Sequence, residues 1–272
     1  MKKIYFTTGL PRSGNTLFAS ILNQNPNITA TGHSATPDIF AAINQAESKK
    51  IFSYWKDQNA INNVYSSIFH SFYKDYKTPY VIERADWISP FNMSMLYRYT
   101  PNEIKIVILV RDILDIIKSF LVLCQNNPNF FINQIYNDLN PDTLYLPELE
   151  EKADIIMSKE GFINFILLSI NFLNNNNLLH LCHFVEYNDL IENPKEVFDK
   201  VYDFYGIDRF SHNFESLQQL SVNGIIYDDT LLGAPMHELR TSGITKKEHN
   251  IVLPDKVISK YSGLEQWRSF NA

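Results

Sequence analysis

The sequence predicts an α/β fold with a central, mostly parallel sheet flanked by helices. Short apolar runs alternate along the chain with segments of helical periodicity, which is the pattern of strands joined by crossover helices. The run IKIVILV at 104–110 is apolar throughout, as expected for a strand that is covered on both faces. With 272 residues, 45% of them hydrophobic, the chain can bury one large core, and we expect a single domain over 1–272.

Each element follows from a local pattern. Residues 4–8 are a short apolar run and predict the first strand, which opens directly into a glycine-rich turn. From Thr16 onward, Leu17 and Ile21 lie at helical spacing, and Pro26 soon ends that helix. The later elements, predicted in the same way, are strands at 79–84, 104–110 and 178–187, a helix directly after 104–110, and a helix from about 194 to 205.

Composition narrows the class of protein. The formal net charge of −6 argues against binding to nucleic acid or to anionic membranes. The longest apolar stretch, 162–173, is too short to span a bilayer, and the apolar run before TTGLPRS is too short for a signal peptide. Cys124 and Cys182 provide no disulfide framework. We therefore expect a cytoplasmic protein with no nucleic-acid partner and no membrane span.

The turn after the first strand, GLPRSGNT at 9–16, is the most informative motif. Gly9, Gly14 and Thr16 stand where the phosphate-binding pattern G-x-x-x-x-G-K-[ST] has its glycines and hydroxyl residue, but Asn15 replaces the lysine. That lysine serves the β and γ phosphates of a nucleoside triphosphate. The loop therefore predicts a site for a different anion, unless the turn merely connects strand to helix.

The same turn offers a substitute for the missing lysine. Backbone N–H groups of a glycine-rich turn and the positive end of the next helix form an anion site whatever the side chains are. Arg12 can supply a cation from another direction, and Ser13 and Thr16 can donate hydroxyl groups.

A second constellation follows the strand at 104–110. In RDILDIIKS, Arg111 ends the strand and Ser119 lies two turns into the next helix. A guanidinium at a strand end and a hydroxyl on the adjoining helix can together hold a second phosphate, away from the loop. Two separate phosphate sites indicate a nucleotide phosphorylated at two positions. The alternative is that Arg111 pairs with Asp112 and caps the helix.

Together the two motifs resemble the sulfotransferases that use 3′-phosphoadenosine 5′-phosphosulfate (PAPS). In that family a strand leads into a loop like PRSGTT, which holds the 5′-phosphosulfate, and a later strand leads into R-D-x-x-D-x-x-x-S, which holds the 3′-phosphate. Here PRSGNT and the spacing of Arg111 and Ser119 match. The segment 184–194, FVEYNDLIENP, is similar to the family's Y-E-D-L-x-x-x-P, and 237–267 resembles the C-terminal segment of bacterial and tyrosylprotein-type members.

The resemblance implies a P-loop-like three-layer sandwich and an enzyme that moves a sulfuryl group from PAPS to a hydroxyl or amine, releasing 3′,5′-adenosine bisphosphate. It implies PAPS as co-substrate and no required metal. Tyr187 matches an aromatic residue that lies against the adenine, or is a packed tyrosine at a strand end. Lys246 and Lys247 could fold over the phosphates, or form a solvated charge run. The residues expected to bind the donor are Arg12, Ser13, Gly14, Asn15, Thr16, Arg111, Ser119, Tyr187, Lys246 and Lys247.

Three residues are expected to take part in catalysis. Arg12 would stabilise the charge that develops on the leaving oxygen. His33 lies close to where tyrosylprotein-type members carry a catalytic glutamate, and an imidazole suits a general base at neutral pH. Glu83 and Asp86 are the competing carboxylates. Arg84 lies between them, near the position of a catalytic lysine in those members, and either touches the sulfuryl group or pairs with one of the two carboxylates.

The acceptor and two other functions stay open. Segments 36–78 and 125–150 are expected to supply helices and a lid on the acceptor side, the latter because it is polar and interrupted by prolines. The aromatic residues of 52–73 either line an acceptor cleft or pack in a helical layer. An ATP-dependent kinase with Asp112 as the Mg²⁺-bridging acid and a non-catalytic nucleotide-binding module are the alternative functions.

Overall fold

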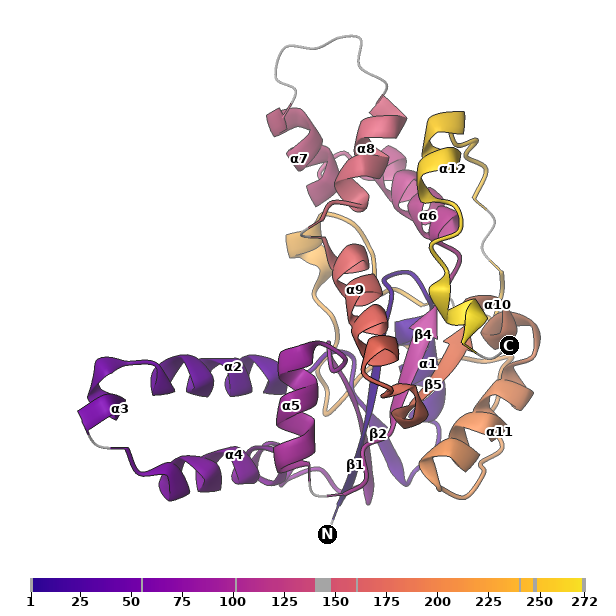
Figure 1. The fold of residues 1–272 in the computed structure, drawn as a ribbon. Coiled ribbons are helices and arrows are strands. Elements are labelled where there is room, and N and C mark those ends of the chain that lie inside the picture. Colours follow the sequence, from indigo (N-terminus) through magenta and orange to yellow (C-terminus); the bar gives the residue numbers. More distant parts are fainter. Residues whose placement is uncertain are drawn as a thin grey trace.

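The structure, a computed structural model, describes residues 2–54, 56–100, 102–139, 148–159, 161–239, 241–246 and 249–270. A five-stranded sheet in the order β2-β3-β1-β4-β5, with every neighbouring pair parallel, forms its centre (Figure 1). The strands are β1 (Lys3–Gly9), β2 (Ile28–Ala30), β3 (Tyr80–Arg84), β4 (Ile106–Val110) and β5 (Cys182–Glu186). The predicted α/β fold with a parallel sheet is confirmed.

Helices connect the strands and cover the sheet. They are α1 (Asn15–Leu22), α2 (Thr36–Glu47), α3 (Lys50–Tyr54), α4 (Gln58–Phe72), α5 (Pro90–Tyr99), α6 (Ile113–Asn126), α7 (Phe131–Leu139), α8 (Glu148–Ile156), α9 (Phe162–Asn175), α10 (Tyr187–Glu192), α11 (Pro194–Tyr205) and α12 (Asp255–Tyr261), with short 3₁₀ turns η1 (Leu179–Leu181), η2 (Asp229–Leu232) and η3 (Gln266–Ser269). None of the helices in the described ranges is both long and apolar enough to cross a membrane.

Alternation along β1 divides the core into two layers. Successive side chains of a strand point to opposite faces, so Phe6 packs with the helices α4 to α9 while Tyr5 packs with α1 and α11. On the second face Tyr5 stacks on Tyr205 at a centroid distance of 5.0 Å, and Phe18 stacks on Phe198 at 5.2 Å. Both faces are therefore buried, which explains why β4 is apolar throughout.

Segment 36–78 forms a helical arm beside the sheet. In Figure 1, α2 and α4 lie side by side and extend away from the strands, and α3 lies at their outer end. Phe40 stacks on Tyr65 at 5.9 Å, and Tyr65 stacks on Tyr99 of α5 at 4.8 Å, so aromatic packing holds the base of the arm. Phe69 and Tyr73 are fully buried, while Phe72 and Tyr54 are exposed, and Trp55 lies outside the described residues.

Two segments differ from the sequence prediction. Strand β2 was not predicted, because three residues at the edge of a sheet are too few for a periodic signal. Segment 125–150 was predicted as a connection or lid, but 131–139 form helix α7, which packs against α8 near α6. The many polar residues of this segment obscure the periodicity of a short amphipathic helix. The side chain of Ile132, and that of Phe130 just before the helix, are buried and anchor it. Residues 140–147 lie outside the described residues.

The parallel arrangement brings the ends of three strands to one edge of the sheet. Gly9 ends β1, Arg84 ends β3, and Arg111 follows β4 directly. The register pairs Thr7 of β1 with Arg84 of β3, so these ends lie on neighbouring strands. Ligands of open parallel sheets bind beyond this carboxyl edge, and the predicted site residues gather there.

One buried carboxyl group ties the helical arm to the sheet. Glu83 in β3 is fully buried, and the hydroxyl of Thr36, at the start of α2, donates a hydrogen bond to its Oε1. Burial raises the pKa of Glu83 to about 7, although the hydroxyls of Thr36, Ser34 and Tyr73 oppose that rise. A carboxyl group in this position cannot reach a substrate, so Glu83 is not the catalytic base.

Glu83→Gln should change how stability depends on pH. The folded protein keeps the proton on Glu83 between about pH 4.5 and 7, where the unfolded chain releases it. The free energy of unfolding of the native protein therefore falls across that window relative to the glutamine variant, by roughly 3 kcal/mol, and the difference is constant above it. Urea unfolding from pH 4 to 8 measures this, with the exposed Glu215→Gln as matched control. Parallel pH curves for Glu83→Gln and the native protein would contradict the assignment.

Candidate active site

The loop after β1 is wound tightly around the sheet edge. Arg12 and Gly14 adopt positive φ angles of 62° and 83°. A Cβ at Gly9 would lie 2.6 Å from the carbonyl oxygen of Leu109, so only glycine fits beside β4. The Asn15 amide donates to the carbonyl of Leu10 at 2.8 Å and closes the loop from inside. Asn15, which replaces the P-loop lysine, therefore stabilises the loop backbone through its side chain. The end of the loop leads directly into α1.

The loop forms one wall of a cleft of about 210 Å³. The carboxyl edge of the sheet and the segment after residue 235 form the other walls. Of the residues predicted to bind donor or to catalyse, those that line this cleft are Arg12, Gly14, Asn15, Thr16, Arg84, Arg111, Ser119 and Tyr187. The loop, the end of β3, the start of α6 and the start of α10 thus contribute to a single cavity.

Arg111 is held in the cleft by two neighbours. Its Nη1 donates to the carbonyl of Arg12 at 2.9 Å, and its Cζ lies 4.1 Å from the centre of the Tyr187 ring. The side chain is nearly buried, and its Nε has no hydrogen-bond partner among the described residues. Burial lowers the pKa of Arg111, because the charged form loses hydration. A buried cation with an unpaired N–H is suited to receive an anionic ligand.

Arg12 reaches across the cleft from the loop. Its Nε donates to the Ser119 hydroxyl at 3.1 Å, and its Nη1 donates to the carbonyl of Met236 at 2.7 Å. Burial lowers the pKa of Arg12, and the nearby Arg111 charge lowers it further. The predicted pair Arg111 and Ser119 therefore shares one cleft with the loop arginine.

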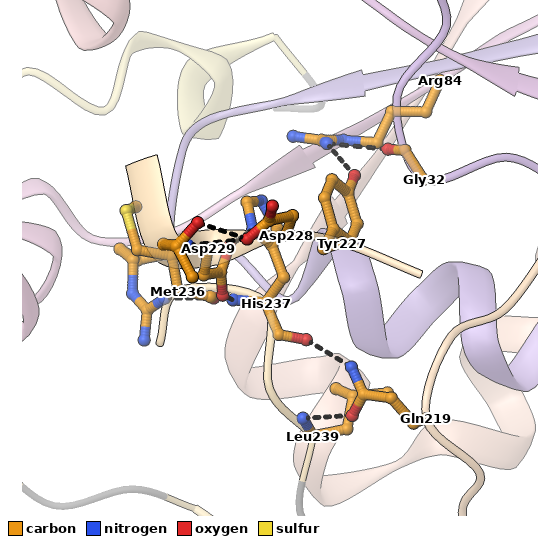
Figure 2. Close-up of polar contacts among 11 residues, drawn as sticks. Gly32, Arg84, Gln219, Tyr227, Asp228, Asp229, Met236, His237 and Leu239 are labelled. Atoms are coloured by element: carbon orange, nitrogen blue, oxygen red, sulfur yellow. Dashed lines mark hydrogen bonds and ion pairs between the residues drawn. The ribbon is translucent and has the colours of Figure 1, made fainter. Parts of the chain in front are cut away.

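Arg84 enters the cleft from the end of β3. Its Nη1 donates to the carbonyl of Gly32 at 2.8 Å and to the Tyr227 hydroxyl at 3.3 Å (Figure 2). The predicted alternative, an ion pair with Glu83 or Asp86, does not form. Within the described ranges, none of the three cleft arginines lies within ion-pair distance of a carboxylate. The cleft is cationic although the whole chain is acidic.

His33 lies beside this cleft and not in its lining. It borders two other cavities, one next to Tyr227 and one next to Asp86. The ring is exposed yet close enough to protein to lose part of its hydration, and that loss, followed by the Arg84 charge, lowers the pKa of His33. Asp86 is half-buried, and burial raises its pKa.

The remaining predicted residues lie in less direct positions. The Ser13 side chain is fully buried, and its Oγ has no partner in the described part of the chain. Lys246 is exposed and pairs with Glu192 at 3.4 Å, outside the cleft lining. Lys247 lies outside the described residues. Asp112 caps α6 by accepting the backbone N–H of Asp115 at 3.2 Å.

Sequence reasoning missed a cluster that covers the cleft. Tyr227, Asp229 and His237 come from an irregular segment between α11 and α12, and Figure 2 shows Tyr227 next to Arg84, with His237 and then Asp229 farther from it. Asp229 Oδ1 lies 2.5 Å from Nδ1 of His237, and the His237 ring stacks on Tyr227 at 3.7 Å. From the sequence, His237 has no role beyond its place at the start of the segment 237–267. No regular periodicity marks these residues, and a spacing of eight positions in an irregular segment does not predict that Asp229 and His237 meet.

These features define a P-loop-like α/β protein with a cleft lined by three arginines at the carboxyl edge of its sheet. In the described residues no three metal-ligating side chains gather into a possible metal site. A family model described as the sulfotransferase family matches residues 5–212. The match spans more than half of the chain, and the chain therefore belongs to the sulfotransferase family.

A search of solved structures finds sulfotransferases, and the first of them supports the fold. The sulfotransferase domain of the olefin synthase from Synechococcus PCC 7002 is 14% identical and aligns over 100% of this chain and 97% of that one, with a TM-score of 0.54. A sulfotransferase domain from the curacin biosynthetic pathway is 16% identical over 96% of this chain and 97% of that one, with a TM-score of 0.48. A sulfotransferase from Alicyclobacillus acidocaldarius is 14% identical over 76% of this chain and 82% of that one, with a TM-score of 0.47. A comparison with curated protein sequences finds no match.

Gly14→Ala should destabilise the loop by more than its backbone angle alone requires. A Cβ at Gly14 meets Leu190 Cδ2 at 3.0 Å and combines that crowding with a φ of 83°. Gly263 has a similar φ of 77° and nothing within 4 Å, so Gly263→Ala is the matched control. We expect a loss of about 1 kcal/mol for the control and about 2 kcal/mol for Gly14→Ala in urea unfolding. Equal losses would mean that the loop does not press on α10.

Proposed function

We propose that the protein transfers a sulfuryl group from PAPS to a hydroxyl or amine of an acceptor and releases 3′,5′-adenosine bisphosphate. The observation that carries the proposal is the convergence of Arg12, Arg84 and Arg111 on one cleft without a carboxylate partner among the described residues. The family generally uses PAPS, a donor with anionic groups at both ends. Three arginines, of which Arg12 and Arg111 are desolvated by burial, suit such a ligand better than a neutral one.

The loop is proposed to bind the phosphosulfate end. Gly14 and Thr16 line the cleft at the start of α1, where N–H groups and the helix dipole favour an anion. Arg12 adds a charge from the loop itself. The buried Ser13 hydroxyl and the engaged Asn15 amide leave these two residues to act through their backbone N–H groups.

The pair Arg111 and Ser119 is proposed to bind the 3′-phosphate. The buried, unpaired Nε of Arg111 supports this role, since a phosphate oxygen would satisfy it. Tyr187 is proposed to lie against the adenine; its ring already stacks on the Arg111 guanidinium. Lys246 and Lys247 are proposed to move over the phosphates, which requires Lys246 to leave Glu192.

Positioning and charge stabilisation would account for most of the rate. An acceptor oxygen or nitrogen attacks sulfur in line while the departing phosphate oxygen gains negative charge. Arg12 and Arg84 are proposed to face that charge, and the resemblance predicts His33 as the base and no metal. Segments 36–78 and 125–150 are proposed to border the acceptor site, and the bacterial or tyrosylprotein-type branch remains our proposal for the subfamily.

Arg111→Ala should weaken the binding of 3′,5′-adenosine bisphosphate. Loss of a hydrogen bond to a charged group costs roughly 1.5–3 kcal/mol, which corresponds to a tenfold or greater rise in Kd. Isothermal calorimetry with and without Mg²⁺ measures it, and we expect binding that does not depend on the metal and exceeds that of ATP. Arg209→Ala, at an exposed arginine paired with Asp203, is the matched control. An unchanged Kd in Arg111→Ala would remove the 3′-phosphate assignment.

Arg84→Gln should slow sulfuryl transfer and spare nucleotide binding. Removal of one donor aimed at developing charge costs about 10²–10³ in turnover, whereas the phosphate contacts of the loop and Arg111 stay in place. Release of label from ³⁵S-PAPS to water and to a panel of alcohols and amines gives the rate, and calorimetry gives the Kd of the bisphosphate. The exposed Arg98→Gln serves as control. A parallel loss of binding and turnover would show that Arg84 holds the nucleotide instead.

A further inference from the structure

An aspartate–histidine pair covers the cationic cleft from the segment between α11 and α12. The Nδ1 of His237 lies 2.5 Å from Oδ1 of Asp229, and the backbone N–H of His237 donates to Oδ2 of the same carboxylate at 2.8 Å. One carboxylate thus binds both the ring and the main chain of one histidine. Such a two-point contact fixes the ring relative to η2, on which Asp229 lies.

Two further contacts hold the imidazole. The Tyr227 ring is parallel to it, with centroids 3.7 Å apart and an interplanar angle of 9°. Gln219 donates to the carbonyl of His237 at 2.9 Å and accepts the backbone N–H of Leu239 at 2.9 Å (Figure 2). Ring, carbonyl and N–H of His237 are therefore all engaged, which is the support expected for a side chain that must keep one orientation.

The pair also determines which ring nitrogen carries the proton. A carboxylate only accepts hydrogen bonds, so Nδ1 of the neutral His237 must be the donor and Nε2 must keep its lone pair. Among the residues that the structure describes, Nε2 meets no hydrogen-bond partner. The arrangement leaves a basic nitrogen free on a fixed ring.

That ring belongs to the lining of the donor cleft. His237 borders the same cavity as Arg12, Arg84 and Arg111. The preceding residue, Met236, accepts the Arg12 hydrogen bond through its carbonyl, and the stacked Tyr227 contacts Arg84 through its hydroxyl. The His237 ring is therefore connected to Arg12 through Met236 and to Arg84 through Tyr227. These are the two arginines proposed to face the departing oxygen.

We propose that His237, oriented by Asp229, accepts the proton of the attacking acceptor. In this step the acceptor oxygen forms a bond to sulfur, and the bond between sulfur and the phosphate oxygen breaks. The electron pair of the broken bond stays on the phosphate of the released bisphosphate. The acceptor proton moves to Nε2, and the Asp229 carboxylate balances the charge of the imidazolium. Asp229 is then a positioning residue, and the proposal rests on the proposed sulfuryl transfer.

The geometry favours His237 over His33 for this role. His33 borders the adjoining cavities instead of the arginine-lined one, and no carboxylate hydrogen bond to its ring is recorded in the described residues. His33 is therefore the matched control: a histidine on the other side of Arg84, predicted from the sequence to be the base.

The reverse reaction separates a proton-transfer role from a structural one. With 3′,5′-adenosine bisphosphate and an aryl sulfate as probes, the same residue must return the proton to the departing phenolate. His237→Ala should slow 4-methylphenyl sulfate about 100-fold or more and slow 4-nitrophenyl sulfate far less, because nitrophenolate leaves without a proton. Imidazole should restore part of the lost rate, and His33→Ala should show neither selectivity nor rescue. An equal loss for both sulfates, or selectivity in His33→Ala, overturns the proposal.

A second measurement needs no turnover. Nitrogen-15 NMR of the histidine-labelled protein should show His237 protonated at Nδ1 and bare at Nε2, and Asp229→Asn should abolish this preference. A proton on Nε2 in the native protein overturns the proposal, and this result decides when no aryl sulfate reacts. Calorimetry with the bisphosphate tests the donor site separately. Normal bisphosphate binding with the wrong tautomer rejects His237 alone, whereas absent binding in the native protein rejects the proposed function.

Discussion

The charge of three arginines that form no ion pair with any described carboxylate is the constraint on which the site depends. Arg12, Arg84 and Arg111 meet at the carboxyl edge of the sheet, and burial lowers the pKa of Arg12 and Arg111. Neutral acceptors hold them: the carbonyls of Arg12, Gly32 and Met236, the Ser119 hydroxyl and the Tyr227 hydroxyl. Carbonyls and hydroxyls orient a guanidinium without cancelling its charge, so the cleft stays attractive to an anion within an acidic chain.

The same contacts help to hold the segment around Tyr227 and Met236 over the sheet edge. The segment that contains Tyr227 and Met236 has little regular structure, and hydrogen bonds to Arg12 and Arg84 are among its links to the body of the protein, beside the apolar packing of Leu220 and Ala234. Tyr227 also lies so close to Gly32 that a Cβ there would be 2.7 Å from its hydroxyl. Because Arg12 and Arg84 hydrogen-bond to this segment and also line the cleft, the same two residues contribute to the shape of the cleft and to its charge.

The sequence allowed the prediction of those parts of the fold and site that depend on local patterns. Strand β4, the glycine-rich turn and the spacing of Arg111 and Ser119 are encoded over a few residues each, and they meet because parallel strands share one carboxyl edge. Helix α7 and strand β2 were not predicted, because α7 is short and rich in polar residues and β2 has only three residues. Asp229 and His237 could not be predicted, because their meeting depends on how an irregular segment folds over Arg12 and Arg84. The sequence also did not reveal that the Ser13 hydroxyl is buried. A motif predicts the path of the loop backbone at Ser13 but does not determine where its side chain points.

Neighbouring residues on β3 connect the helical arm to the cleft. Successive side chains of a strand point to opposite faces, so Glu83 lies on the side of the arm, bound by Thr36, while Arg84 lies on the side of the cleft. Glu83 is buried among hydroxyl groups at the base of α2, and it fixes the end of β3 from behind. Arg84 then projects a long, charged side chain from a strand end that is paired with β1 and anchored by Glu83. The arm and the cleft meet at these two residues, because one strand end anchors both.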